Sequence, residues 1–231
     1  MKMSKDCTPV YTLLIGMFCF CMSVSGAEWV PVHKEPQHRQ VFENEQVRIL
    51  DVELPPGYVS LYHKHLLDLI YVTVSGSTVW AQPLNGQKRQ ATVNAGDLRF
   101  SSDNHDLPHI HRVGNIGDTP FRVIGVGIKG ERDKSSATPA LTGDIRGLKQ
   151  EIERSHAAVY RITLKPGEST GLHSHNLPVT EVFLTEGQRL SESGETVSIV
   201  PGEFRWQAGG FSHKHENKGD QTVEIIEIQW R

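Results

Sequence analysis

The sequence predicts an all-β protein built from two copies of one β-barrel unit, and three observations support this. The first is an internal duplication, in which the stretch HRVGNIGD, residues 111–118, returns in the second half as HKHENKGD, residues 213–220. The second is the alternation of apolar and polar residues over short runs, which is typical of strands. The third is the number of glycine turns between these runs, which suits a jelly roll or barrel better than a helical bundle.

Residues 1–27 are expected to form a secretory signal peptide. Lys2 and Lys5 precede the apolar run VYTLLIGMFCFCMSV, and the small residues Ser25 and Ala27 mark a cleavage position. The run is short for a membrane span of roughly 20 residues. We therefore expect cleavage, no stable membrane span afterwards, and a secreted or periplasmic protein. An uncleaved membrane anchor is the alternative.

Composition narrows the chemistry of the mature chain. All three cysteines, Cys7, Cys19 and Cys21, lie in the expected signal peptide. Disulfides, thiolate catalysis and cysteine-ligated metal sites are therefore excluded after cleavage. The formal net charge is −3, with Lys and Arg mixed among the acids, so nothing favours nucleic acid as a partner. No P-loop, dinucleotide fingerprint or serine-nucleophile elbow is present.

The first copy is expected over residues 28–130. The run VRILDVELPPG, residues 47–57, alternates like a strand and ends in a Pro-Gly turn. The pair His63 and His65 follows, and Asn85-Gly86 suggests a hairpin turn inside a later alternating run. The stretch GDLRF, the repeated phrase and the apolar strand PFRVIGVGI complete the copy.

Residues 131–150 are expected to be a linker, because this region is rich in Gly, Ser, Thr and charge. The stretch LKQEIERSH, residues 148–156, could add a short helix. The second copy is expected over residues 151–231, where AAVYRITLKPG, the pair His173 and His175, GEFRW and TVEIIEIQW repeat the order of the first.

Histidines carry the functional prediction. Eight of the twelve form four H-x-H pairs, namely His63/His65, His109/His111, His173/His175 and His213/His215. Residues i and i+2 of a strand share a face, so an inward pair places two imidazoles side by side inside a barrel. A third histidine from a facing strand would complete a facial metal site.

The frame set by Asn115 and Asn217 selects the third histidine, which is His111 in the first copy and His213 in the second. His109 and His215 are the neighbouring alternatives. His105 and His109 lie in an expansion of the first copy, and either could still reach the site. The remaining histidines, His33, His38 and His156, are interpreted as surface residues.

This pattern resembles the cupin superfamily in its two-domain bicupin form. The family's first motif, G-x5-H-x-H-x3/4-E-x6-G, is similar to Gly57, His63, His65 and Gly76, and to Gly167, His173, His175 and Gly187. Its second motif, G-x5-P-x-G-x2-H-x3-N, is similar to Gly96, His111 and Asn115, and to Gly202, Gly210, His213 and Asn217, with Ala208 replacing the proline. The resemblance covers nearly all of the chain after residue 27 and implies two tandem jelly-roll barrels.

Neither copy has a glutamate at the position where the family's first motif places its glutamate ligand. In the first copy the position is Leu69, and the adjacent Asp68 would point to the other face unless the strand bulges. This copy is expected to be a three-histidine site. In the second copy the position is Thr180, and a bulge near Pro178 could bring Glu181 inward as a ligand. The alternative is that Glu181 is an exposed strand residue.

The predicted metal ligands are therefore His63, His65 and His111 in the first copy, and His173, His175, Glu181 and His213 in the second. Imidazoles with at most one carboxylate suit Fe, Mn, Ni, Cu or Zn, and poorly suit Mg or Ca. Three protein ligands leave coordination positions open for substrate, dioxygen or water. Arg99 and Arg205 occupy equivalent positions, and each could hold a substrate carboxylate if it points inward. The alternative is a solvated strand arginine.

The resemblance extends to oxalate decarboxylases, quercetin dioxygenases and germins, and implies a small organic acid or phenolic substrate. We expect a secreted metal-dependent enzyme of oxygenase type, without naming a catalytic residue. One alternative is a non-catalytic module that binds a small ligand, a sugar or metal. Another is a protein in which one half is active and the other supports it. Homo-oligomerisation is left open.

Overall fold

The computed structural model describes residues 28–101, 109–129, 141–143, 145–154, 157–190 and 194–230. Among these residues the regular structure is strand, apart from the 3-10 helix η1 (Val32–Lys34). No helix in this part of the chain is long and apolar enough to cross a bilayer. The expected signal peptide, most of the predicted linker, His105 and His156 lie outside the described residues.

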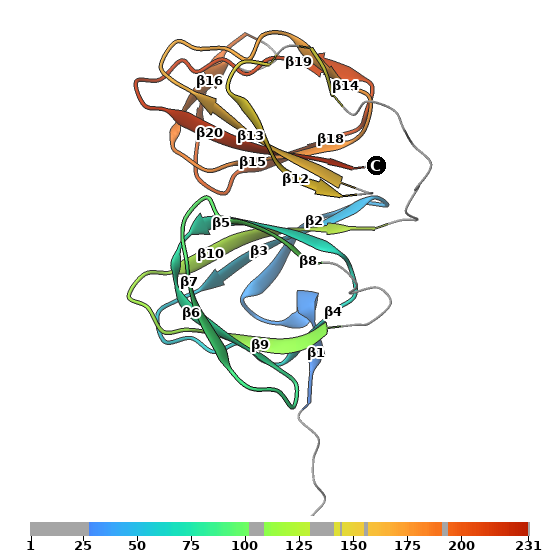
Figure 1. Ribbon diagram of the computed structural model, residues 1–231, viewed down its shortest axis with the longest axis vertical. Helices are drawn as coiled ribbons and strands as arrows, with labels where there is room; N and C mark the ends of the chain where they lie inside the picture. The colour runs from blue at the N-terminus through green and yellow to red at the C-terminus, as the bar shows by residue number, and fades with distance from the viewer. Residues whose placement is uncertain are drawn as a thin grey trace, which may run out of the picture.

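The first half is a barrel of two sheets, each five-stranded within the described residues, which occupies the lower part of Figure 1. One sheet has the spatial order β1 (Val30–Pro31), β4 (His63–His65), β9 (His109–Asn115), β6 (Ser77–Pro83) and β7 (Arg89–Val93). The other has the order β2 (His38–Glu43), β3 (Val47–Leu54), β10 (Phe121–Ile128), β5 (Leu69–Ser75) and β8 (Leu98–Ser101). The chain passes repeatedly between the two sheets, as in a jelly roll.

The second half repeats this plan. Its large sheet has the order β12 (Leu148–Arg154), β13 (Ala157–Leu164), β20 (Val223–Trp230), β15 (Val179–Phe183) and β18 (Phe204–Gln207). The opposite wall contains β11 (Leu141–Thr142), β14 (His173–His175), β19 (Phe211–His213), β16 (Gly187–Leu190) and β17 (Thr196–Ile199). The prediction of an all-β chain with two tandem jelly-roll barrels is confirmed.

Two expectations for the region between the copies are corrected. The stretch LKQEIERSH contains strand β12 rather than a helix, and β12 pairs antiparallel with β13. Its charged residues favour a helix by propensity, but the open edge of β13 offers a full set of backbone hydrogen bonds. Residues 141–142 of the predicted linker also form a strand, β11, which pairs with β14. The domain boundaries themselves stay a prediction.

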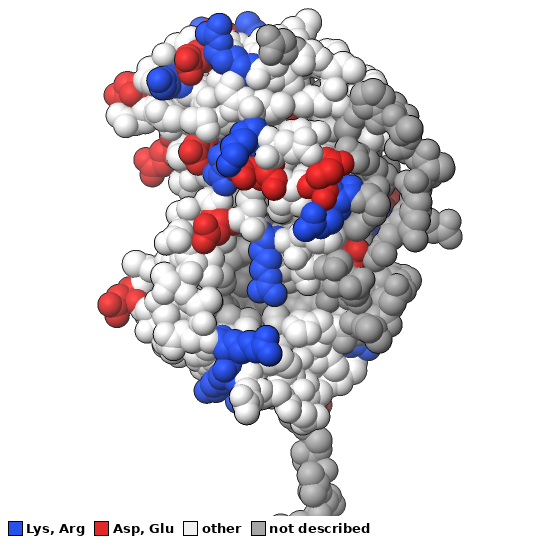
Figure 2. Space-filling model, viewed as in Figure 1, with Lys and Arg blue, Asp and Glu red and all other residues white. Residues whose placement is uncertain are grey.

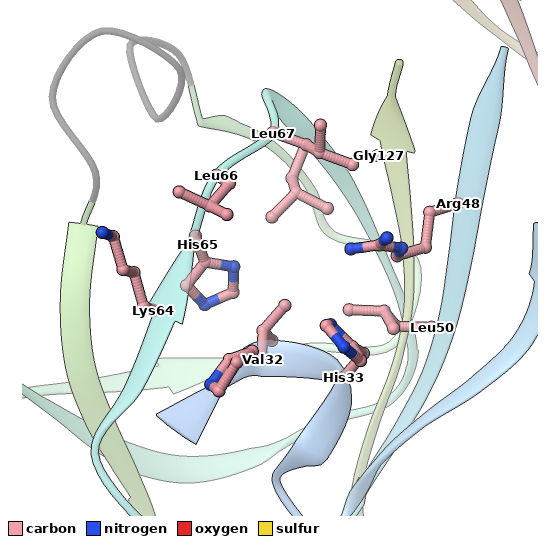
Figure 3. A pocket seen from close by; sticks show the side chains of 11 residues that line it. Val32, His33, Arg48, Leu50, Lys64, His65, Leu66, Leu67 and Gly127 are labelled. Atoms are coloured by element: carbon pink, nitrogen blue, oxygen red, sulfur yellow. The ribbon is translucent and has the colours of Figure 1, made fainter. Parts of the chain in front are cut away.

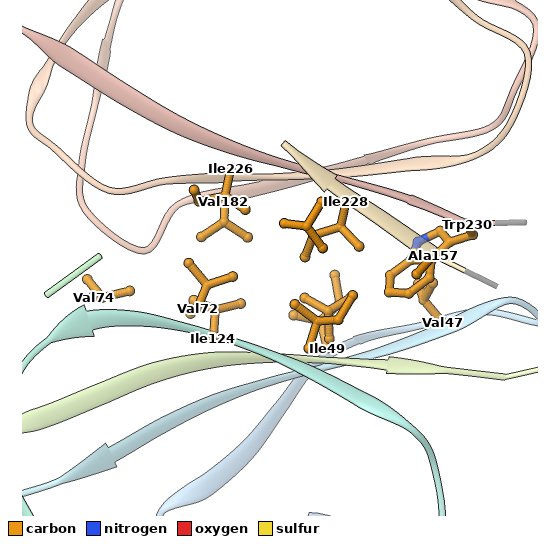
Figure 4. Close-up of a cluster of buried hydrophobic side chains, with 13 residues drawn as sticks. Val47, Ile49, Val72, Val74, Ile124, Ala157, Val182, Ile226, Ile228 and Trp230 are labelled. Carbon is orange, nitrogen blue, oxygen red and sulfur yellow. The ribbon is translucent and has the colours of Figure 1, made fainter. Parts of the chain in front are cut away.

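The two large sheets pack face to face, and their contact is the largest apolar cluster among the described residues (Figure 4). Its buried residues are Val47, Ile49, Ile70, Val72, Val74, Ile124 and Val126 from the first barrel, and Ala157, Val159, Val182, Ile226, Ile228 and Trp230 from the second. These strands are therefore covered on both faces. Alternate residues face either the other barrel or the interior of their own barrel.

A second, smaller core fills the interior of each barrel. Leu50, Val52, Leu54 and Val123 pack with Val32 of η1 in the first barrel. In the second barrel the interior core contains Ile162, Leu164, Phe183, Ile199, Val223 and Ile225. Burial on both faces explains why β3, β5, β10, β13, β15 and β20 are nearly continuous apolar runs rather than clean alternations. A polar residue within such a run therefore stands out.

Candidate metal centres

The repeated phrase contributes a buried asparagine that closes a turn in each barrel. Asn115 donates from Nδ2 to the carbonyls of Leu54 and Thr119, both at 2.8 Å. Its Oδ1 accepts from the Gly117 amide at 3.1 Å. A Cβ at Gly117 would lie 2.3 Å from the Ser77 hydroxyl, so only glycine fits there.

Asn217 makes the same bonds in the second barrel, donating to the carbonyls of Leu164 at 2.9 Å and Gln221 at 2.7 Å. The Gly219 amide donates to its Oδ1 at 2.9 Å. The asparagine thus ties the end of the histidine-bearing strand to the large sheet. This turn holds the third histidine of each copy opposite the H-x-H pair.

In the first barrel, β4 and β9 bring together the three predicted histidines. His63 pairs in register with His111, and the Nε2 atoms of His65 and His111 are 3.1 Å apart. The ring centroids of His63 and His111 are 4.6 Å apart. One ligating atom from each of the three residues lies within 4.8 Å of the others, so all three can bind one ion.

The protonation of His63 fits a metal ligand. Its Nδ1 donates to the Leu61 carbonyl at 2.9 Å, so the lone pair is on Nε2. That Nε2 is buried and has no hydrogen-bond partner among the described residues. Burial lowers the pKa of His63 to about 3. A neutral imidazole with its second nitrogen held by a carbonyl is what a divalent transition metal requires.

A small pocket of about 20 Å³ lies beside His65 (Figure 3). Val32, His33, Arg48 and Leu50 line it, together with Lys64. The side chain of His65 borders this space, and its Nδ1 has no hydrogen-bond partner in the described part of the chain. The pocket has room for about one water molecule, which could accept a hydrogen bond from His65 Nδ1. His65 would then present Nε2 to the ion.

A cavity of about 490 Å³ occupies the interior of the first barrel. His65 and His111 lie on its wall beside Tyr71, and the apolar lining includes Val79 and Phe121. The volume is in the usual range for sites that hold a small organic molecule. In Figure 2 the lower half of the molecule, which is this barrel, is hollowed, and Lys and Arg side chains border the hollow.

Arg99 reaches this cavity. Its neighbours Leu98 and Phe100 pack against the cluster between the barrels, so Arg99 faces the opposite side of β8 and lines the cavity. Arg205 of β18 is placed equivalently, because its neighbours Phe204 and Trp206 pack against the same cluster. Both arginines therefore face the interior of their own barrel. Their role in holding a substrate stays a prediction.

Among the described residues, the metal-binding group of the first barrel consists of three histidines and includes no carboxylate. The strand register places Tyr71 opposite Gly125 in this barrel, where the second barrel places Glu181 opposite Glu227. Asp68 is buried but lies outside the histidine group. The first barrel thus has three imidazoles and a cavity, whereas two carboxylates occupy the equivalent positions of the second.

In the second barrel, His173, His175 and His213 also converge. The Nε2 atoms of His175 and His213 are 2.9 Å apart, and His173 Nδ1 donates to the Gly171 carbonyl at 3.1 Å. The fourth member of the group is Glu227 of β20, which the sequence analysis missed. Its Oε1 is 3.6 Å from His213 Nε2, and its Oε2 is 3.8 Å from His175 Nε2. The signal available in the sequence was an acid inside the apolar run TVEIIEIQW.

Glu181 faces inward, as its predicted role as a ligand requires, but without the expected bulge; its role as a ligand stays a prediction. β15 pairs with β18 and β20 in unbroken register, so no bulge is needed to turn Glu181 inward. Val182 belongs to the cluster between the barrels, which places Glu181 on the interior face with 1% exposure. It therefore is not an exposed strand residue. It groups with His213, His215 and Glu227 rather than with His173 and His175.

His215 is also inside the barrel, beside the predicted His213. It is buried, and its Nε2 lies 3.1 Å from Glu227 Oε1. Burial alone would lower the pKa of His215, but the carboxylates of Glu181 and Glu227 raise it. Burial alone would raise the pKa of Glu227, but the neighbouring imidazoles of His173 and His215 hold it well below its usual range.

One histidine interpreted as a surface residue is in fact buried. His38 packs against His63 with ring centroids 4.2 Å apart, and its Nδ1 lies 2.5 Å from Glu35 Oε2. His38 lies on β2, which pairs with the edge of β3. His33 is half-buried. His109 is exposed and contacts His111 through a 3.0 Å nitrogen–nitrogen approach.

Comparisons with known proteins agree with this architecture. No protein-family model matches the chain. An oxalate-binding protein of Thermotoga maritima is 31% identical over 107 residues, which span 41% of this chain and 88% of that protein.

Two solved structures show the fold. A cupin 2 conserved barrel domain protein from Leptotrichia buccalis matches with a TM-score of 0.52 and 13% identity, over 83% of this chain and 87% of that one. A salicylate 1,2-dioxygenase from Pseudaminobacter salicylatoxidans matches with a TM-score of 0.56 and 10% identity, over 80% of this chain and 71% of that one. Both alignments extend across the two barrels. Together with this fold, the 31% identity to a relative that the chain covers to 88% shows that the chain belongs to the cupin superfamily, in its two-barrel form.

Proposed function

We propose that this protein is a metal-dependent enzyme of oxygenase type that acts on a small organic acid inside the first barrel. The observation that carries the proposal is the single cavity wall shared by His65, His111 and Arg99. A metal-binding histidine group and an inward cation thus face the same space, which is large enough for a small organic acid.

Each group has a definite task in this proposal. His63, His65 and His111 would hold a divalent transition metal, which would supply a Lewis acid and a binding place for dioxygen when bound. Arg99 would bind a substrate carboxylate through its planar guanidinium and so orient the substrate. The apolar lining, with Val79 and Phe121, would exclude bulk water from the bound acid.

The names of the similar proteins support an acid as substrate. One is named for binding oxalate and another for oxygenating salicylate, and both molecules carry a carboxylate. We propose in addition that the protein is exported, because residues 1–27 have the pattern of a signal peptide. The native metal belongs to the set Fe, Mn, Ni, Cu and Zn.

Oxygen consumption tests the proposal. The protein loaded with Fe(II) or Mn(II) is offered oxalate, salicylate, other small carboxylic acids and phenols, and dioxygen uptake and products are measured. We expect turnover of at least one acid. The double variant His63→Ala/His65→Ala should abolish it, and Arg99→Gln should raise KM for the acid more than it lowers kcat.

Arg39→Gln is the matched control, because Arg39 is an exposed arginine on β2 and does not line the cavity. It should leave both kinetic constants unchanged. An Arg99→Gln variant with the KM of the wild type would remove Arg99 from substrate binding. An absence of oxygen uptake with every acid and metal would contradict an oxygenase.

The second candidate function is non-catalytic binding of a small carboxylic acid. The relative named as an oxalate-binding protein favours it specifically. Calorimetry with the metal-loaded protein distinguishes the two functions. Saturable binding of an acid that is neither consumed nor accompanied by oxygen uptake would establish the binding protein.

A further inference from the structure

The interior of the second barrel contains two overlapping groups of ligating residues. Two overlapping sets share His213 and Glu227, and they differ in whether His173 and His175 or Glu181 and His215 complete them. We propose that this barrel binds two metal ions, the second held by Glu181, His215 and Glu227. This goes beyond the proposed function, which concerns the first barrel.

The His213 ring separates the two sets. Its Nε2 lies 2.9 Å from His175 Nε2, on the side of the first set. Its Nδ1 lies 3.3 Å from Glu181 Oε1, on the opposite side of the ring. Glu181 is therefore not part of the group around His173 and His175. An ion bound by that group leaves the Glu181 carboxylate without a cation.

The burial of Glu181 makes this arrangement informative. Its side chain is 1% exposed, and neither carboxylate oxygen has a hydrogen-bond partner among the described residues. A buried carboxylate is strongly disfavoured unless a charge or hydrogen bonds compensate it. His215 Nε2 lies 3.5 Å away, at a distance at which both groups could contact one ion between them.

Glu227 is placed to bridge the two ions. Its Oε1 is 3.1 Å from His215 Nε2, and its Oε2 is 3.8 Å from His175 Nε2. Its Oε1 also lies 3.6 Å from His213 Nε2, so Oε1 lies between the two sets and Oε2 lies beside the first. A bridging carboxylate is compatible with the spacing of about 3.5–4 Å that is usual in two-metal sites. Two carboxylates and an imidazole are suitable donors for Mn, Fe or Zn.

The competing interpretation assigns Glu181 a positioning role. In that case Glu181 would only accept a hydrogen bond from His213 Nδ1. It would thereby orient the His213 ring, which would bind a single ion, as carboxylates beside metal-bound histidines do. The two interpretations differ in the number of ions bound. Metal stoichiometry therefore separates them.

The experiment uses the full chain with His63→Ala/His65→Ala, which removes the first-barrel site. The protein is dialysed against Mn²⁺ or Zn²⁺ alone, and bound metal is measured by elemental analysis. We expect about two ions per chain, falling to about one with Glu181→Gln added, as a three-ligand set loses one ligand. Mn²⁺ electron paramagnetic resonance should show a coupled pair in the first case and an isolated ion in the second.

Glu186→Gln is the matched control, because Glu186 is an exposed glutamate of the same barrel and should leave two ions bound. His215→Gln provides a second test if Glu181→Gln does not fold, as judged by circular dichroism. One ion or none in the parent double variant overturns the proposal. One ion whose affinity falls in Glu181→Gln identifies a positioning residue instead.

Discussion

At the scale of single residues, the duplicated asparagine does structural work that its position in the histidine phrase does not reveal. Asn115 and Asn217 are both 1% exposed, and each uses its amide to join two carbonyls across a turn. The phrase therefore recurs because one turn must hold one histidine in each barrel.

Asn217→Ala should lower the free energy of unfolding by about 2–4 kcal/mol, because it leaves the carbonyls of Leu164 and Gln221 and the Gly219 amide without their partner. Urea unfolding measures this loss. Asn94→Ala, at an exposed turn position, is the control and should change stability by no more than about 0.5 kcal/mol. Equal losses in the two variants would contradict the role of the turn.

Glu227→Gln should release metal from the second barrel, because Glu227 supplies the carboxylate next to His173, His175 and His213. We expect elemental analysis to show that the first barrel keeps its ion, since its group contains no residue of β20. Retention of the full metal content would show that the three histidines suffice. Glu224→Gln, on the same strand, is a suitable comparison.

At the scale of elements, the strands of the two large sheets have two buried faces, one toward the other barrel and one toward the interior of their own barrel. In β20, Ile226 and Ile228 face the other barrel, whereas Ile225 and Glu227 face the interior. Such a strand appears in the sequence as one apolar run, so periodicity identifies the strand but not its faces. The sequence therefore left open whether Glu181 on β15 faces inward.

Ile226→Ala tests the packing between the barrels. Ile226 is 0% exposed in the shared cluster, so its truncation should cost about 2–5 kcal/mol of stability. Chemical denaturation would show the loss. Ile116→Ala, at an exposed isoleucine, should be nearly neutral, and a similarly small effect at Ile226 would mean that the barrels do not depend on this contact.

At the scale of the whole molecule, each barrel extends an arginine to a turn of the other. Arg122 donates to the Pro201 carbonyl at 3.0 Å, and Arg161 donates to the Gly96 carbonyl at 2.6 Å. The two acceptor carbonyls belong to equivalent turns, whereas the two arginines lie on strands that are not equivalent, β10 and β13. The two bonds form a reciprocal pair of polar contacts beside the shared apolar cluster.

The ion pair between Arg161 and Glu151, with Arg161 Nε 2.9 Å from Glu151 Oε1, predicts a pH dependence of stability. Hydrogen bonding to Arg161 holds the pKa of Glu151 below its ordinary value of 4.5. Because the folded-state pKa is the lower one, this stabilisation is present above about pH 4.5 and is lost as the pH falls through the folded value. Urea unfolding from pH 7 to 3 should show a shallower acid decline in Arg161→Gln than in the parent protein. An identical decline would contradict the prediction.

The sequence by itself determined the duplication, the strand-rich barrels and the histidine trios His63/His65/His111 and His173/His175/His213, because these depend on local spacing and period. Only the tertiary structure decided which carboxylates join them, that His38 and His215 are buried, and that Arg99 shares a cavity with the first trio. Such features depend on strands distant in the chain. Where a strand is buried on both faces, its local pattern carries no record of which side faces the site.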